Sequence, residues 1–170
     1  NSLTGGGGND LLAGAAGNDT YVFDTDLALG SDTILESGGG IDKLDFSQTT
    51  TREISVDLSG ATPQIVNAGL TLTLSAVNTI ENATGGALGD ILIGNDLPNT
   101  LTGNDGDDLL SGQTGNDVLT GGAGKNILIG GDGSDQLAAG TGEDLLLGAR
   151  YIYENRFIAL VSLLSEWTSA

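Results

Sequence analysis

The sequence predicts an all-β protein, a parallel β-roll in which short strands and turns stack into a solenoid, followed by a short C-terminal helical cap. Three observations carry this prediction. Residues 85–147 divide into seven consecutive blocks of nine residues without an insertion. The turn half of most blocks is rich in glycine, and the eighth position of every block is leucine. After residue 148 both the glycines and the period of nine disappear. A fixed period of this kind indicates a solenoid.

Each block divides into a turn and a strand. Glycine at the first, second and fourth positions is expected to let the backbone adopt positive φ, so that six residues form a tight turn. The last three residues form a short strand whose middle side chain points inward. Because consecutive turns fall on opposite sides, two blocks make one coil. Equivalent residues of blocks n and n+2 then lie about 4.8 Å apart.

The sixth position places a row of acidic and amide side chains on each side of the roll. Across the seven blocks it is Asp90, Asn99, Asp108, Asp117, Asn126, Asp135 and Asp144. Asp and Asn are also good turn formers, but that role alone predicts a mixture of Asp, Asn and Ser, whereas this row is mainly Asp. Two carboxylates about 5 Å apart repel each other by roughly 3 kcal/mol at an effective dielectric constant near 20. The stack therefore needs a cation to close.

The pattern G-G-x-G-x-D-x-U-x, in which U is a large apolar residue, resembles the RTX family (repeats in toxin, haemolysin type) of calcium-binding proteins. The resemblance implies several Ca²⁺ ions, each held between blocks n and n+2 by both position-six side chains and by carbonyl groups of the turns. The implied ligands are Asp10, Asp19, Asp32, Asp42, Asp90, Asn99, Gly103, Gly106, Asp108, Gly112, Gly115, Asp117, Gly121, Gly122, Gly124, Asn126, Gly130, Gly131, Gly133, Asp135, Gly140, Gly142 and Asp144. Leu88 and Leu97 replace the fourth-position glycine, which weakens the expectation for the first two blocks of this array.

Residues 1–46 are predicted to form a first array of the same kind. Two regular blocks, Gly5–Ala13 and Gly14–Val22, carry an aspartate at the sixth position. The next two turns are longer but keep a glycine, an aspartate and an apolar residue two positions later. The expected position-six rows of this array are Asn1, Asp19 and Asp42 on one side and Asp10 and Asp32 on the other, with Ile34 and Leu44 pointing inward.

Asp24 and Asp26 lie in a long turn of the first array and have two open interpretations. They are either solvated loop acids or further ligands. They do not begin an EF-hand, because Leu29 occupies the position of the required glycine and Leu35 that of the required glutamate.

Residues 47–82 differ in character from both arrays. Residues 54–58 and 70–74 alternate apolar and polar side chains, which predicts strands with one buried face. Pro63 and Gly69 mark the link between them. Without a glycine-rich turn, this segment is predicted to be a metal-poor insert made of coils of the same solenoid, and a separate small sandwich is the alternative. Residues 83–148 form the second array.

Residues 149–170 are predicted to form an amphipathic helix. Tyr153, Phe157, Leu160, Leu164 and Trp167 recur at intervals of three and four residues. We expect this helix to cap the open end of the roll, because solenoids need capped ends. A partner-docking or export-related helix is the alternative.

Composition excludes several functions. With 23 acidic against 5 basic residues the formal charge is −18, which argues against nucleic acid and anionic membranes as partners and favours cations. The chain has no Cys and no His, which excludes thiol and imidazole nucleophiles, zinc sites built on them and disulfides. No run is long and apolar enough for a membrane span. A row of identical carboxylates is not the unequal pair that acid–base catalysis needs, so we expect no enzyme.

Two function classes remain. The RTX resemblance implies a calcium-dependent structural module of a secreted, extracellular bacterial protein, which is disordered at low calcium and folds after type I export. The alternative is an adhesive or carbohydrate-binding module whose roll contacts a polysaccharide or a cell surface, and an exposed aromatic platform would favour it. Because the sequence begins inside a repeat, we expect it to be part of a larger multidomain protein.

Overall fold

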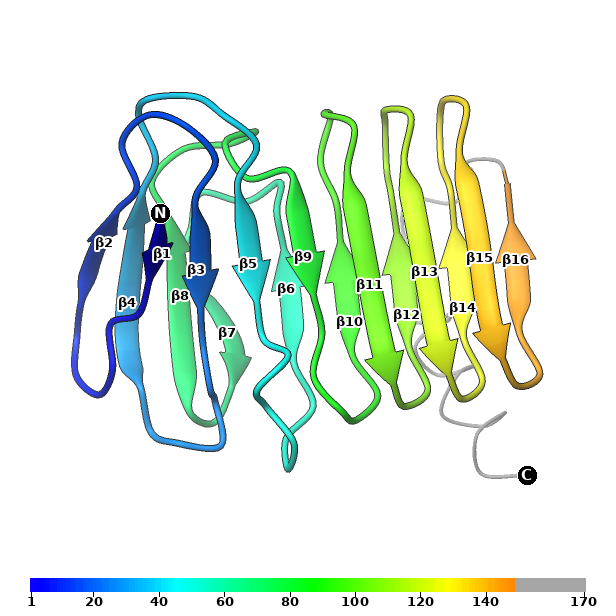
Figure 1. Cartoon of the computed structure of the whole chain (residues 1–170), viewed down its shortest axis with the longest axis horizontal. Coiled ribbons are helices and arrows are strands. Elements are labelled where there is room, and N and C mark those ends of the chain that lie inside the picture. Colours follow the sequence, from blue (N-terminus) through cyan, green and yellow to red (C-terminus); the bar gives the residue numbers. More distant parts are fainter. Residues whose placement is uncertain (149–170) are drawn as a thin grey trace.

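The computed structural model describes residues 1–148, and within them every regular element is a β-strand. The strands stack into one elongated roll whose coils follow one another along the long axis (Figure 1). No helix in this part of the chain is long and apolar enough to cross a membrane. The predicted helical cap at 149–170 lies outside the described residues.

One face of the roll is a seven-stranded parallel sheet that runs its whole length (Figure 1). Its strands, in spatial order, are β1 (Ser2–Leu3), β3 (Thr20–Val22), β5 (Lys43–Asp45), β9 (Asn82–Thr84), β11 (Thr100–Asp105), β13 (Val118–Ala123) and β15 (Gln136–Thr141). Leu101 pairs with Leu119, and Leu119 with Leu137, so equivalent residues two blocks apart stack as the period of nine predicts.

The other face is divided into two sheets. The five-stranded parallel sheet contains β6 (Ser55–Asp57), β10 (Ile91–Ile93), β12 (Leu109–Ser111), β14 (Ile127–Ile129) and β16 (Leu145–Leu147). The four-stranded sheet contains β2 (Leu11–Ala13), β4 (Gly30–Leu35), β8 (Leu70–Leu74) and β7 (Gln64–Asn67).

Strands of the 47–82 segment join both of these sheets. Strand β6 pairs in parallel with β10 of the second array, and β8 pairs in parallel with β4 of the first array. The two predicted strands of this segment are thereby confirmed as strands of the roll. Strand β7 was not predicted. It forms an antiparallel hairpin with β8 that is irregular between Ile65 and Asn67.

A single apolar core follows the axis between the two faces. The inward leucines at the eighth position of the blocks are fully buried at Leu92, Leu101, Leu110, Leu119 and Leu128. In the first array the same core takes Tyr21, Phe23, Ile34, Leu44 and Phe46, and the rings of Phe23 and Phe46 stack with centroids 5.3 Å apart. At the far end Leu137 is partly buried and Leu146 is 42% exposed.

This burial predicts a contrast between adjacent residues of β13. Leu119 is fully buried, whereas Val118 next to it is 36% exposed. We expect Leu119→Ala to lower the free energy of unfolding of the calcium-loaded protein by about 2–5 kcal/mol, because it leaves a cavity in a packed core. Val118→Ala is the matched control and should cost less than about 1 kcal/mol. Urea unfolding followed by circular dichroism measures both, and equal losses would contradict the inward register.

Candidate metal centre

The position-six side chains form rows along the two edges of the roll. The strands of the seven-stranded sheet run opposite to those of the five-stranded sheet and to β2, β4 and β8, so the residues that precede them lie on the opposite edge (Figure 1). Strand pairing stacks the first row in the order Asn1, Asp19, Asp42, Glu81, Asn99, Asp117 and Asp135. The second row is divided between the other sheets, with Asp10 next to Asp32 and with Asp90, Asp108, Asn126 and Asp144 in succession.

In every position-six aspartate of the described chain except Asp10, one carboxylate oxygen accepts a hydrogen bond from the neighbouring coil. Oδ1 of Asp108 accepts from the backbone N–H of Asp90 at 2.8 Å, and Oδ1 of Asp135 accepts from that of Asp117 at 3.1 Å. The same bond recurs in the first array, where Oδ1 of Asp42 accepts from the backbone N–H of Asp19 at 2.8 Å. The position-six side chain is therefore part of the coil-to-coil ladder.

The second carboxylate oxygen is buried without a hydrogen-bond partner in six of these residues. Within the described chain they are Asp10, Asp19, Asp32, Asp108, Asp117 and Asp135. A buried, ionised oxygen without a partner costs several kcal/mol, so an arrangement of this kind needs a counter-ion or a proton. Backbone carbonyls face the same space. A methyl group placed on Gly103 would meet both Oδ2 of Asp108 and the carbonyl oxygen of Gly121. Oxygens that converge with no donor between them fit a hard cation such as Ca²⁺.

The glycines of the pattern have two different tasks. Second- and fourth-position residues take positive φ, as in Gly122 at +115° and Gly124 at +125°. The first-position glycines do not, so the expectation of positive φ was wrong for that position. They make room instead, because a side chain on Gly103 or Gly112 would collide with the position-six carboxylate of the same block. Ala139 occupies this position before Asp144, and Asp144 is not among the residues with an unpaired buried oxygen.

The first two blocks of the second array are built differently. Residues 85–102 contain no positive φ, and Leu88 and Leu97 stand at the fourth position. Oδ2 of Asp90 accepts from the backbone N–H of Gly86 at 2.6 Å, and Oδ1 of Asn99 accepts from that of Asn95 at 2.8 Å. These side chains are satisfied by their own turns, so they fit a cation less well than Asp108 or Asp117.

Asparagine at the sixth position also reduces the need for a cation. The side-chain amide of Asn99 donates to the carbonyl of Glu81 at 2.8 Å, and that of Asn126 donates to the carbonyl of Ala139 at 3.4 Å. The amide thus supplies the donor that an aspartate lacks. The predicted ligands Asn99 and Asn126 remain in the stacked rows, with oxygens that already accept hydrogen bonds.

Burial dominates the electrostatics of the metal-free rows. It raises the pKa of Asp108 to about 8 and the pKa values of Asp90 and Asp117 to about 6. Hydrogen bonds from backbone N–H groups oppose these shifts, and neighbouring carboxylates add to them. Desolvation likewise raises the pKa values of Asp32 and Asp42. Without a cation, therefore, the fold favours protonated aspartates.

Asp26 acts as an anchor for a neighbouring loop. Its two oxygens accept hydrogen bonds from the backbone N–H and hydroxyl groups of Thr50 and Thr51, at 2.7–3.0 Å. These bonds hold its pKa well below the usual range. Asp24 accepts from the backbone N–H of Asp26 at 3.2 Å. Both carboxylates have local partners, which supports the loop-acid interpretation.

The sequence analysis missed two sets of residues. Glu81 stands in the first row, where its Oε2 accepts from the backbone N–H of Asp42 at 2.7 Å, and counting back nine residues from Asp90 would have found it. Position-five side chains form a second ladder in the opposite direction: Asn18 accepts from the backbone N–H of Ile41 at 3.0 Å, and Asn116 from that of Ser134 at 2.9 Å. The recurring G-N-D triplet is the signal for it.

The chain matches the family model described as RTX calcium-binding nonapeptide repeat (4 copies). The matched residues are 1–23, 84–119 and 111–146, which together cover half of the chain. None of the curated proteins compared with the chain matches it.

The stacking order predicts unequal effects for two aspartates. Asp117 lies between Asn99 and Asp135, whereas Asp144 is the last residue of its row. We expect Asp117→Ala to lower calcium affinity and cooperativity more than Asp144→Ala, because it removes a carboxylate that two coils share. A calcium titration followed by circular dichroism measures the difference. Equal effects would count against pairing between blocks n and n+2.

The raised pKa values predict that acid stabilises the metal-free fold. An aspartate has a pKa near 3.9 in an unfolded chain, so its stabilising effect is complete below that pH and is lost as the pH rises through the folded value. For Asp90, Asp117 and Asp108 the loss falls between about pH 4 and the folded values of about 6 and 8. In EDTA, β-structure should therefore increase from about pH 8 to about pH 5, measured by circular dichroism.

A matched pair of variants separates this effect from net charge. Asp108→Asn should remove the part of the transition at the highest pH, whereas Asp96→Asn, at an exposed residue, makes the same change in charge and should keep it. Metal-free stability that is constant or falls towards acid pH would refute the prediction.

Proposed function

Because the chain belongs to the RTX calcium-binding nonapeptide repeat family, whose repeats bind calcium ions at several sites, we propose that it is the calcium-switched structural module of a secreted bacterial protein. In this proposal the chain stays unfolded at low calcium inside the cell, leaves by type I export and folds on meeting calcium outside. Its role is to build a rigid β-roll, not to catalyse a reaction.

One observation carries the proposal: six buried carboxylate oxygens of the position-six rows have no partner. The calcium-free fold keeps this cost together with the repulsion within each row. The formal charge of −18 adds a further tendency to expand. A divalent cation removes all three costs at once, so calcium concentration decides whether the roll forms.

The proposed ligands are stacked pairs in which at least one partner has such an oxygen. Pairs with Asp90 or Asn99, which their own turns satisfy, and with Asn1, which already donates to Asp19, are left out. They are Asp10 with Asp32, Asp19 with Asp42, Asp108 with Asn126, and Asp117 with Asp135. Turn carbonyls such as that of Gly121 complete the donor set. Calcium accepts six to eight oxygens in irregular geometry, whereas magnesium requires a near-ideal octahedron and loses water reluctantly. The donor set therefore favours calcium.

The positions of the proposed ligands divide the chain into calcium-binding and metal-poor segments. We propose that residues 1–46 and 83–148 are two calcium arrays and that 47–82 is a metal-poor insert between them. Strand pairing of β6 with β10 and of β8 with β4 supports an insert that links the arrays mechanically. Calcium bound in either array then stabilises the same roll.

Adhesion or carbohydrate binding is the weaker alternative. An exposed aromatic platform would favour it, but Tyr21, Phe23 and Phe46, the aromatic residues of the described chain, are all buried in the core. The proposal therefore does not depend on a carbohydrate or a cell surface.

The proposal predicts calcium-coupled folding. In EDTA near neutral pH the chain should be expanded and low in β-structure, and millimolar calcium should produce β-type circular dichroism and a smaller radius by X-ray scattering. Magnesium at the same concentration should act poorly. An equal concentration of monovalent salt is the control for screening of the net charge. A chain that is already folded in EDTA at low ionic strength would refute the proposal.

A further inference from the structure

Three carboxylates gather where the first array meets the insert. Asp19 and Asp42 are stacked position-six residues, and Glu36 follows directly after β4. All three are buried, and one oxygen of each lies within 4.8 Å of the others. Within residues 1–148 they form the one such group of three acidic side chains. Glu36 and Asp42 lie outside the segments that match the family.

Glu36 occupies a place that the regular blocks give to glycine. It is the first residue after a strand, where the repeat has the glycine that makes room for the position-six carboxylate. In this turn the glycine is replaced by Glu36, which adds a second carboxylate. A methyl group on Gly14 in the coil below would meet Oε2 of Glu36 at 2.6 Å and Oδ2 of Asp19 at 2.7 Å. The two acidic oxygens therefore face the same space.

The oxygen of Asp19 is the independent sign of a missing ligand. Asp19 is 1% exposed, and its Oδ2 has no hydrogen-bond partner. Its other oxygen accepts from the amino group of Asn1 at 2.6 Å and from the side-chain amide of Asn1 at 2.8 Å. The unpaired oxygen lies beside Gly14, on the same side as Oε2 of Glu36.

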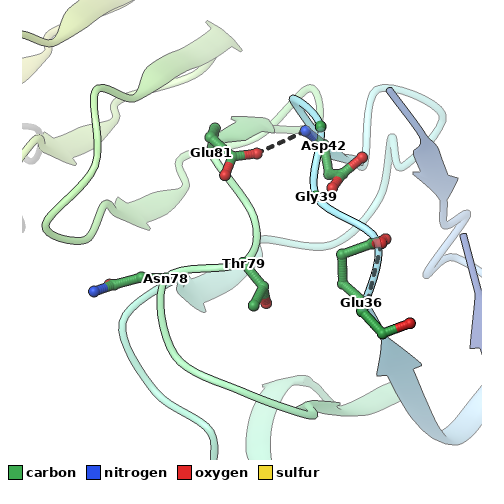
Figure 2. A pocket seen from close by; sticks show the side chains of 8 residues that line it. Glu36, Gly39, Asp42, Asn78, Thr79 and Glu81 are labelled. Carbon is green, nitrogen blue, oxygen red and sulfur yellow. Dashed lines mark hydrogen bonds between the residues drawn. The ribbon is translucent and has the colours of Figure 1, made fainter. Parts of the chain in front are cut away.

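The core holds Glu36 in position. The hydroxyl of Tyr21, an inward residue of β3, donates to Oε2 of Glu36 at 2.5 Å, and the backbone N–H of Ser37 donates to Oε1 at 3.2 Å. A pocket of about 210 Å³ opens beside the cluster, lined by Glu36, Asp42, Asn78 and Glu81 among others. Figure 2 shows Glu36 reaching up from the end of its strand towards Asp42, with Glu81 on the other side of Asp42.

We propose that Asp19, Glu36 and Asp42 form a cation site with three side-chain carboxylates, and that Ca²⁺ fills it before the nonapeptide turns. The identity of the cation rests on the proposed function. Calcium affinity rises with the number of charged ligands. The regular pairs supply two aspartates, or one aspartate and one asparagine, whereas this site supplies three acids. Glu81 adds a fourth negative charge from the next coil through its bond to the N–H of Asp42.

The position of the site explains why its filling first would help the roll to form. Its ligands come from two turns of the first array, residues 14–19 and 36–42, and Glu81 lies at the end of the insert. An ion bound here would fix the end of the first array and, through the bond from Asp42 to Glu81, the last residues of the insert. Calcium bound later would then extend a roll that has already begun. Tyr21 is a positioning residue, because its hydroxyl holds the carboxylate of Glu36 by a hydrogen bond.

Calcium titration of the full chain by equilibrium dialysis and calorimetry tests the site. Glu36→Gln should remove the tightest binding step, so that the first ion binds at least about tenfold more weakly. Tyr21→Phe keeps all three acids and should weaken that step by about tenfold through loss of orientation. Glu53→Gln, an exposed residue outside the cluster, is the matched control for charge. Asp117→Asn should weaken later steps and leave the first unchanged.

The outcomes separate this inference from the proposed function. A first step that is unchanged in both Glu36→Gln and Tyr21→Phe overturns the site, while later calcium binding would still support the module. No calcium binding by the wild-type chain overturns both. If Glu36→Gln does not fold at any calcium concentration, Tyr21→Phe decides: a weakened first step supports the site, and an unchanged one refutes it.

Discussion

The structure depends on what happens to the second oxygen of each position-six aspartate. The first oxygen belongs to the coil-to-coil ladder, as in the bond from the N–H of Asp90 to Asp108. In six of these aspartates the second is buried without a hydrogen-bond partner, and that of Asp108 lies close to a turn carbonyl. Both roles come from one side chain, so the ladder cannot form without burying the unpaired oxygen. Stacking and cation binding are therefore coupled, and the proposed calcium requirement of the fold rests on this coupling.

The other features of the repeat serve this coupling. Positive φ at the second and fourth positions bends the turn, and the bare first-position glycine admits the carboxylate. Where the pattern is broken, the protein itself supplies the hydrogen-bond donors. The backbone N–H of Gly86 donates to Asp90, and the side-chain amide of Asn126 donates to the carbonyl of Ala139. Coils with an unpaired buried oxygen and coils whose position-six side chain is fully hydrogen-bonded thus occur in the same roll. The single core keeps them in one roll. It does so although the sequence separation between stacked residues is 18 in the regular repeats and 22, 23, 36 or 39 elsewhere.

The period of nine was sufficient to predict the roll, its register and the stacked rows, because stacked parallel strands copy a sequence period directly into space. Asp32 and Asp42 were found despite longer turns, since the inward residue two positions later is buried in each case. The antiparallel strand β7 was not found, because no periodicity marks a hairpin that pairs only with its neighbour. Glu36 was missed for a different reason. Its role depends on Tyr21 and Asp19 in another coil, and the turn that contains it is longer than the regular repeat.

The most direct measurement is the folding of a variant in which the unpaired oxygens are replaced. Asparagine at Asp10, Asp19, Asp32, Asp108, Asp117 and Asp135 keeps one acceptor for the ladder and gives the second atom a hydrogen to donate, as Asn99 and Asn126 already do. Circular dichroism and X-ray scattering in EDTA report whether the roll forms. If the buried oxygens impose the calcium requirement, this variant gains β-structure and compactness without calcium, and added calcium changes it little. A variant that is as unfolded in EDTA as the wild-type chain, and still folds at the same calcium concentration, would contradict the account.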